Sequence, residues 1–331
     1  MHHITRKLLL LVCCALALTG CAAPQAADTP VDGSSLSITN AATADPESAQ
    51  VTLTDCTGLA LTVSKNPTCV VGLSSSLAEI WLLSGGTLAG VTDDAVSERA
   101  LAVGDAAIIG SIKTPSAESI LALSPDLVIL SADTPSHMEL TAILAKSDIP
   151  YYAAKVEQFS DYLKVLNDFT TLTGREDLYD QNGTAVQQQI DALLAKVPAC
   201  DEMPTVLYLR AYSSGVKVKA RDNVACDILL EVGAVNVADG NAALEELSME
   251  AIVESDPDYI FVATMGDEQE ALQALDRMLC QNPAWDTLTA VENGHFYVLP
   301  KDLFHYKPNA RWAESYSYLL SILWPEVYGA A

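Results

Sequence analysis

Cationic side chains are scarce in this chain, and many of them gather in two short segments. The sequence holds 18 Lys and Arg residues against 43 Asp and Glu residues, a formal net charge of −25. Guanidinium and ammonium groups bind carboxylates through charge-assisted hydrogen bonds. The two segments therefore predict a wall that binds an anionic small molecule, although a solvated surface would use the same residues. The cations are Arg210, Lys217, Lys219 and Arg221 in the first segment and Lys301, Lys307 and Arg311 in the second.

Aromatic and histidine side chains accompany these cations. Tyr212, Tyr306 and Trp312 could stack on a ring, and the tyrosines could ligate haem iron, although each could equally be a packing residue. His137 and His305 follow predicted strands, on the side where a ligand would bind. A zinc or manganese site needs several histidines and a carboxylate at one point. Two histidines argue against such a site, so we expect no bound metal ion and no cofactor.

Known catalytic motifs are absent from the sequence. It contains no G-x-S-x-G elbow, no G-x-x-x-x-G-K-[ST] loop, no H-E-x-x-H and no G-x-G-x-x-G after a strand. A serine nucleophile with His137 or His305 stays an alternative, because catalytic triads are assembled in space. The acidic composition makes nucleic acid and anionic lipid surfaces poor partners. We therefore expect a binding protein and not an enzyme.

One phrase occurs twice, and its spacing indicates the domain organisation. The sequence SAESILALSPDLVI that starts at Ser116 returns as SMEAIVESDPDYIF at Ser248, an offset of 132 residues. Each copy is typical of a helix that begins at the Ser, ends at the Pro-Asp pair and leads into a buried strand. A period of this length is about the size of one domain. It implies two similar lobes with a cleft between them.

The remaining pattern completes two α/β lobes. Non-alternating apolar runs predict parallel strands that are covered on both faces. We expect two Rossmann-like lobes with mainly parallel sheets, at 51–159 and 198–331, joined by a long connecting helix within 160–197 that breaks near Gly174. Predicted strands lie at 51–63, 69–73, 88–92, 127–130, 150–154, 205–210, 259–262 and 296–299, and predicted helices at 75–83, 141–145 and 310–323.

The parallel strands also predict where a ligand binds. In open parallel sheets, ligands lie beyond the carboxyl ends of the strands. The loops at those ends are 74–77, 92–94, 131–137, 212–217, 265–267 and 301–307. We expect these loops to border the cleft.

The N-terminus has the features of an export signal. Arg6 and Lys7 precede an apolar stretch at 8–18 that is too short to span a bilayer, and small residues end at Cys21. Residues 1–20 are predicted to be a signal peptide whose end resembles the bacterial lipobox. Cys21 would then carry lipid on the extracytoplasmic face of the cell membrane; the alternative is ordinary secretory cleavage with an incidental Cys. Residues 21–50 are too polar to fold and are expected to form a disordered tether.

Five cysteines remain after Cys21, and their pairing is open. An exported protein favours disulfides, and Cys56 with Cys69 would close a hairpin around Thr57 and Gly58. The other three cysteines allow at most one more bridge. All five could instead be small buried hydrophobic residues. The five are Cys56, Cys69, Cys200, Cys226 and Cys280.

Taken together, these features resemble the substrate-binding proteins of ABC importers, and in particular the class that takes ferric siderophores, haem or cobalamin. The resemblance rests on the E-x-I-x-x-x-x-P-D phrase in both lobes, GSIKTPS at 110–116, the helix end at 227–233 and KPNARW at 307–312, and it covers about residues 68–325. It implies that the cleft captures an iron chelate, either a ferric siderophore or haem, and passes it to a permease dimer and its ATPase. Cobalamin is the alternative ligand, and a lipid-anchored sensor or adhesin is the alternative function. The protein is expected to be a monomer.

The resemblance also implies a role for Glu118 and Glu250, which hold matching places in the two copies. In the family, one acid on each lobe at this place forms a salt bridge with an arginine of each permease subunit. The alternative is that both carboxylates only stabilise helix N-termini.

Overall fold

The structure is a computed structural model that describes residues 50–199, 202–221 and 223–329. The predicted signal peptide, Cys21 and Cys200 lie outside the described residues, as does the predicted tether except for Gln50. Within the described ranges, no helix is long and apolar enough to cross a membrane.

The N-terminal lobe is built on one parallel sheet of five strands in the order β5-β4-β3-β8-β9. Strand β8, which lies between β3 and β9, has four consecutive fully buried residues, as expected for a strand with both faces covered. The strands are β3 (Val70–Gly72), β4 (Gly90–Val91), β5 (Ala107–Ile108), β8 (Leu127–Ser131) and β9 (Tyr151–Ala154). The helices are α1 (Ser75–Leu83), α2 (Asp94–Ser97), α3 (Ala117–Leu123) and α4 (Pro135–Lys146), and a small hairpin joins β6 (Gly110–Ser111) to β7 (Thr114–Pro115).

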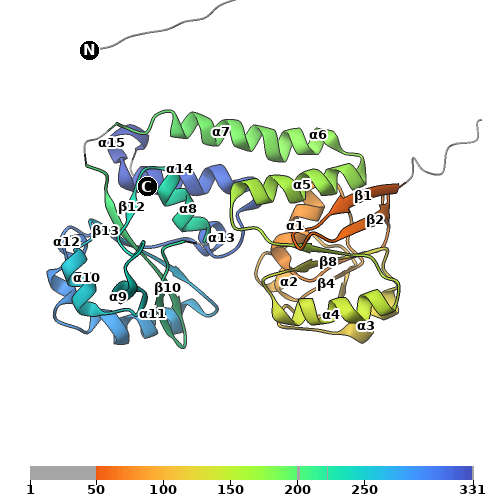
Figure 1. The fold of residues 1–331 in the computed structure, drawn as a ribbon, viewed down its shortest axis with the longest axis horizontal. Coiled ribbons are helices and arrows are strands. Elements are labelled where there is room, and N and C mark those ends of the chain that lie inside the picture. Colours follow the sequence, from red (N-terminus) through yellow and green to blue (C-terminus); the bar gives the residue numbers. More distant parts are fainter. Residues whose placement is uncertain (1–49, 200–201, 222, 330–331) are drawn as a thin grey trace, which may run out of the picture. The chain divides into compact units, whose positions relative to one another are not determined.

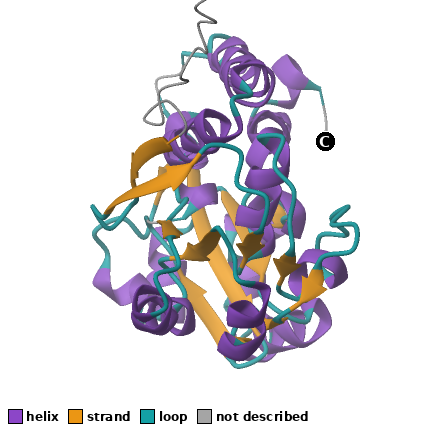
Figure 2. Cartoon of the chain, turned by 90° about the vertical axis from the view of Figure 1, so that its right-hand side faces the viewer, coloured by secondary structure: helices purple, strands orange, loops and turns teal. Residues whose placement is uncertain are grey.

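The C-terminal lobe repeats this plan with the strand order β11-β10-β13-β14, and β12 pairs with the start of β10. All pairs are parallel except the β10–β11 hairpin. Figures 1 and 2 show helices on both sides of the strands, so the predicted pair of mainly parallel α/β lobes is confirmed. The strands are β10 (Thr205–Tyr212), β11 (Gly215–Val218), β12 (Val235–Asn236), β13 (Tyr259–Thr264) and β14 (Phe296–Val298). The helices are α8 (Val224–Glu231), α9 (Ala242–Glu245), α10 (Met249–Ser255), α11 (Glu268–Leu275), η3 (Asp276–Cys280), η4 (Trp285–Thr287), α12 (Thr289–Glu292), α13 (Lys301–Phe304), η5 (Asn309–Arg311), α14 (Trp312–Leu323) and α15 (Pro325–Tyr328).

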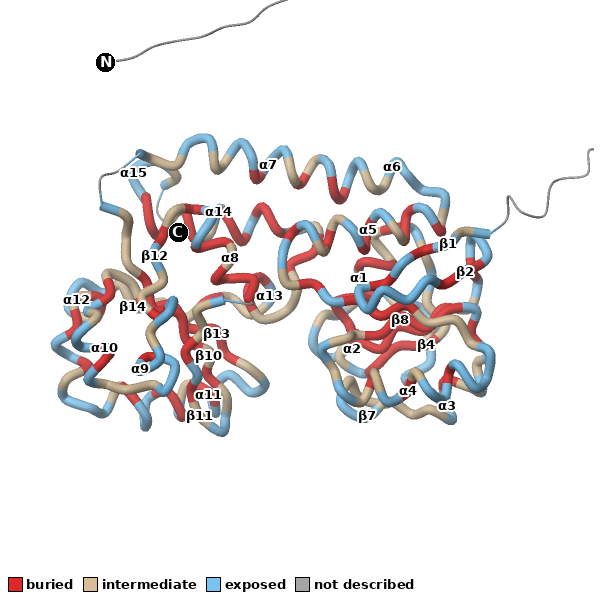
Figure 3. Tube along the Cα trace, viewed as in Figure 1, coloured by how far each residue is buried: buried red, intermediate tan, exposed pale blue. Residues whose placement is uncertain are grey.

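Helices connect the lobes. The first, α5 (Phe159–Thr173), ends at Gly174, whose positive φ of 66° suits a residue without a Cβ. Helix then continues through α6 (Glu176–Tyr179), the π-helical turn η2 (Asp180–Thr184) and α7 (Ala185–Leu194), which runs back towards the C-terminal lobe in Figure 1. The largest hydrophobic cluster includes Val70 and Phe169 as well as Tyr208 and Leu319, so one core passes through both lobes and the helices between them. Figure 3 shows this core as buried segments in the strands, α5 and α14.

The repeated phrase forms the same structure twice. The Ser116 side chain accepts a hydrogen bond from the Ser119 amide at the start of α3, and Ser248 caps α10 in the same way. The Asp after each Pro then receives donors from the start of the neighbouring strand. Asp126 accepts from the Thr68 and Cys69 amides at 2.8 and 2.9 Å, and Asp258 accepts from the amide and hydroxyl of Thr205 at 2.8 and 2.6 Å. The phrase therefore ties adjacent strands together in both lobes.

The N-terminal segment of the described chain differs from its prediction. A single strand was predicted over 51–63, but β1 (Gln50–Thr54) and β2 (Ala60–Ser64) form an antiparallel hairpin. The Asp55 carboxylate makes the turn, because one oxygen accepts from the Thr57 and Leu59 amides at 2.8 and 3.0 Å. Its other oxygen accepts from the Ala153 amide of β9, which fastens the hairpin to the sheet.

Cys56 and Cys69, one pairing that the sequence left open, do not form a disulfide. Cys56 lies exposed beside Ala153, near the end of β9, whereas the Cys69 thiol contacts the Leu123 carbonyl ahead of β3. These positions are at opposite ends of a parallel sheet, too far apart for a disulfide. Cys280 is also free, and burial raises the pKa of its thiol.

We predict that Asp126→Ala and Asp258→Ala each lower the free energy of unfolding by about 1 kcal/mol, because two or three donors lose a charged acceptor that is partly screened by water. Urea unfolding measures the change. Glu254→Ala, which removes an exposed carboxylate from α10, is the control and should cost less than either.

The Asp126 effect should depend on pH. Hydrogen bonds from Cys69 and then Thr68 hold the pKa of this carboxyl below its usual range. Because the folded-state pKa is the lower one, the stabilisation is complete above the unfolded-state value of about 3.9 and is lost as the pH falls through the folded-state value. The wild-type protein should therefore keep its advantage over Asp126→Ala at about pH 6 and lose it at about pH 2. An equal advantage at both pH values would contradict this account.

Candidate functional site

A cavity of about 1000 Å³ lies between the lobes. Its walls are the segments that follow the parallel strands, as the strand rule predicts. The N-terminal lobe contributes the ends of β3, β8 and β9 together with α2, and the C-terminal lobe contributes the end of β10, the turn after β13 and the loop after α13. Two helices also begin at this cavity, α1 with Ser74 to Ser76 and α8 with Asn223 and Val224. Helix N-termini carry partial positive charge and favour anions.

The C-terminal wall of the cavity carries three cations that have no carboxylate partner among the described residues: Arg210, Lys219 and Lys307. The Arg210 guanidinium contacts the Met265 sulfur and lies 5.7 Å from the Tyr212 ring centroid, while its Nε is buried without an acceptor. Burial lowers the pKa of Lys307, and the Asp133 and Glu157 carboxylates across the cavity act in the opposite direction. An anion on this wall would provide the acceptors that these groups lack.

His305 lies among these cations as a neutral imidazole. Burial, followed by the charges of Arg210, Lys301 and Lys307, lowers the pKa of His305 to about 4. Its Nδ1 is buried and has no partner in the described part of the chain. A neutral imidazole at this place can donate or accept one hydrogen bond without adding charge.

The N-terminal wall is acidic and largely paired. Lys155 lies 2.7 Å from the Glu157 carboxylate and 3.9 Å from that of Asp133. The Tyr306 hydroxyl donates to Glu98, and burial followed by this carboxylate raises the pKa of Tyr306. The two walls therefore differ: the C-terminal wall carries three cations without carboxylate partners, whereas the N-terminal wall carries carboxylates with partners and one such cation, Lys113.

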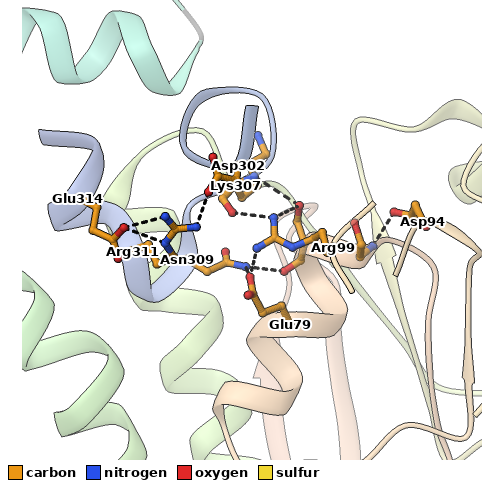
Figure 4. Close-up of polar contacts among 10 residues, drawn as sticks. Glu79, Asp94, Arg99, Asp302, Lys307, Asn309, Arg311 and Glu314 are labelled. Carbon is orange, nitrogen blue, oxygen red and sulfur yellow. Dashed lines mark hydrogen bonds and ion pairs between the residues drawn. The ribbon is translucent and has the colours of Figure 1, made fainter. Parts of the chain in front are cut away.

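The structure brings six of the predicted ligand residues to the cavity and leaves five outside it. Exposed ion pairs hold two of the five: Arg221 with Asp239, and Arg311 with Asp302 and Glu314 (Figure 4). The six at the cavity are Arg210, Tyr212, Lys219, His305, Tyr306 and Lys307.

The other three predicted residues have structural roles or face solvent. His137 is fully buried in α4, where one ring nitrogen accepts from the Ser131 amide and the other pairs with the Ile112 carbonyl. Trp312 is buried against the Phe159 ring. Lys217 is exposed on β11 because its neighbours Val216 and Val218 take the buried face. These three residues therefore do not line the cavity.

Besides Glu98 and the turn that holds Ile112 and Lys113, two further cavity segments were not among the predicted loops. Lys155 and Glu157 directly follow β9, whose predicted end at residue 154 is correct, so the strand rule applied to 150–154 would have identified them. Asn223 caps α8 by accepting from the Ala225 amide, and an Asn directly before the first apolar residue of a helix is the start signal that could have identified this place.

Three comparisons bear on the family. Residues 70–303 match the family model described as periplasmic binding protein. The chain is similar to the Fe(3+)-citrate-binding protein YfmC of Bacillus subtilis, with 26% identity over 248 residues that cover 73% of this chain and 76% of that protein. It is also similar to the putative ABC transporter substrate-binding lipoprotein YhfQ of the same organism, with 25% identity, covering 71% of this chain and 76% of that protein. Its fold is similar to that of Staphylococcus aureus SirA complexed with staphyloferrin B, with a TM-score of 0.64 and 18% identity over 82% of this chain and 98% of that chain.

Proposed function

Because the chain belongs to the periplasmic binding protein family, we propose that it captures a ferric chelate rich in carboxylates in the cleft between its lobes. It is a substrate-binding protein of the class that serves ABC import of iron chelates, and it is not an enzyme. The observation that carries the finer proposal is the wall of Arg210, Lys219 and Lys307, three cations without carboxylate partners in the described chain. The Fe(3+)-citrate named for one relative has the matching charge.

The polar groups of the cavity suit such a ligand. Serines at the start of α1, charged side chains and neutral His305 lie in the lining, and they can bind a ligand that presents many acceptor oxygens. The Tyr306 hydroxyl, a predicted haem ligand, already donates to Glu98. Cobalamin carries a single phosphodiester anion and would leave most of the cationic wall without anionic partners. These points support a compact anionic chelate.

We predict that Arg210→Met weakens binding of ferric citrate at least about tenfold, because a charge-assisted contact worth about 1.4 kcal/mol or more is lost from a partly desolvated site. Isothermal titration calorimetry measures the affinity. Arg221→Met is the matched control, since Arg221 pairs with Asp239 outside the cavity. This variant should bind ferric citrate with the affinity of the wild-type protein.

Equal affinities of Arg210→Met and the wild-type protein would contradict the anion wall. A thermal-shift comparison of ferric citrate, haem and cobalamin identifies the ligand class in that case, because a ligand at 100 times its dissociation constant stabilises a protein by about 2.7 kcal/mol. Stabilisation by cobalamin alone would replace the proposed ligand.

Delivery of the ligand to a permease is the second part of the proposal, and it assigns Glu118 and Glu250 to docking. Both carboxylates are exposed in the first turns of α3 and α10. Helices between parallel strands run antiparallel to them, so these helix N-termini lie at the carboxyl edge of each sheet, the edge that borders the cleft. Two similar lobes can present equal charges to two permease subunits related by a two-fold axis. This geometry supports docking with the cleft facing the membrane partner.

We predict that the Glu118→Gln, Glu250→Gln double variant binds its ligand normally but fails to support iron uptake. The loss of both charges should cost folding only about 0.3 to 1 kcal/mol per helix. Uptake of labelled ferric citrate by cells is the measurement, and Glu254→Gln on the same helix α10 is the control. Normal uptake by the double variant would mean that the two acids serve only as helix caps.

Lipid attachment at Cys21 is the third part of the proposal. It is supported by the small residues before Cys21 and by the word lipoprotein in the name of one relative. We predict that Cys21→Ala moves the protein from the membrane fraction to the soluble extracytoplasmic fraction on cell fractionation, with ligand affinity unchanged. A chain that lacks residues 22–49 but keeps Cys21 is the control and should stay with the membrane. Retention of Cys21→Ala in the membrane fraction would contradict lipid anchoring.

A further inference from the structure

The loop His305–Asn309 belongs to the C-terminal lobe but is hydrogen bonded to the N-terminal lobe. The Arg99 guanidinium donates to the Lys307 carbonyl at 3.1 Å, and the Lys307 amide donates to the Ser76 hydroxyl at 3.4 Å. The Asn309 side-chain amide donates to the Ser76 carbonyl at 2.9 Å and to Glu79 at 2.5 Å. Figure 4 shows Arg99, Asn309 and Lys307 meeting above Glu79 of α1. We call Ser76, Glu79, Arg99, Lys307 and Asn309 the interlobe clamp.

Arg99 is the centre of this clamp. Its side chain is only 9% exposed, and it forms an ion pair with Glu79, which also accepts from Asn309. The guanidinium lies 5.8 Å from the Tyr306 ring centroid as well. Ion pairs shielded from water are screened less than surface pairs. The contacts of Arg99 therefore reach both lobes at once and do not depend on an exposed, weak pair.

The backbone at Lys307 is held on both sides. The Lys307 carbonyl accepts from Arg99 and the Lys307 amide donates to Ser76. These two hydrogen bonds fix the Cα of Lys307, from which the side chain extends, relative to the N-terminal lobe. Asn309 is fully buried with a positive φ of 53°, a conformation that Asn tolerates better than most residues. Lys307 lines the cavity, where the charges of Asp133, Glu157 and Arg210 act on its ammonium, and it has no carboxylate within ion-pair distance among the described residues.

We propose that Arg99 is a positioning residue that acts from the opposite lobe to set the place of the Lys307 ammonium in the cleft. Arg99 itself is not among the cavity-lining residues. Its effect on a ligand therefore passes through the groups that it holds: the loop that carries Lys307, and the Ser76 hydroxyl, which accepts from Arg99 at 3.5 Å. This proposal rests on the proposed function only where ligand affinity is the readout.

A double-mutant cycle tests whether Arg99 acts through Lys307. Arg99→Met and Lys307→Met should each weaken ferric citrate binding at least about tenfold, measured by calorimetry, and the double variant should be within about twofold of Lys307→Met alone. Arg175→Met, which breaks an exposed pair with Asp177, is the control and should bind as the wild-type protein does. Losses that multiply in the double variant would overturn the proposal.

Hydrogen exchange of the free protein gives a readout that needs no ligand. Arg99→Met should speed exchange in the peptide that spans residues 304–310 by about tenfold or more, while peptides from β8 and β13 keep wild-type rates. Asn309→Asp, which sets a second carboxylate beside Glu79, should have the same local effect. Unchanged exchange at 304–310, or faster exchange throughout the protein, would overturn the positioning role. If the wild-type protein failed to bind ferric citrate, the proposed ligand would be wrong, and exchange would still decide whether Arg99 holds the loop.

Discussion

The parallel order of the strands is the constraint on which the rest of this structure depends. In a parallel sheet every strand ends at the same edge and every crossover helix begins there. Two such sheets that face each other bring their carboxyl edges and helix N-termini to one cavity. The cavity thus collects backbone amides at α1 and α8 and the loops that carry charged side chains. Asp126 and Asp258 hold equivalent positions in the two lobes and help to maintain this order. Each joins the start of one strand to the start of its neighbour.

The cavity wall contains buried polar groups that lower the stability of the free protein and are available to bind a ligand. Arg210 Nε and His305 Nδ1 are buried without partners in the described chain, and such groups cost free energy when they are left unsatisfied. Lys307 has lost part of its hydration, which is why its pKa is lowered. A ligand with matching acceptors would recover these costs on binding. The unpaired groups are therefore expected at a site whose partner is a separate molecule.

The repeat and the apolar runs were sufficient to predict the lobes, the direction of the sheets and most cavity loops, because these features are local or periodic. The selection of cations was less successful. Arg221 is neutralised by Asp239 and Arg311 by Asp302 and Glu314, and such pairings depend on tertiary positions that spacing alone does not specify. Lys217 differs, since the alternation of Val216, Lys217 and Val218 already indicated that the lysine faces away from the buried side.

Tertiary context also decided the remaining differences. His137 has the sequence position of a ligand residue, but the start of α4 turns its ring inward, where two backbone groups satisfy both nitrogens. The hairpin at 50–64 depends on the Asp55 turn, a local signal that strand alternation on both sides obscured. Arg99 was not a candidate at all, because its importance comes from a contact with a loop more than two hundred residues further along the chain.

The hydrophobic core that passes from Val70 through Phe169 to Tyr208 has a consequence for how the molecule comes apart. Two lobes with separate cores would melt as separate domains, each with its own transition. Here α5 and α14 contribute to the same cluster as both sheets, so melting one lobe would strip apolar cover from the other. Each lobe also has a hydrophobic cluster of its own, so the shared cluster couples the unfolding of the two lobes without merging their cores.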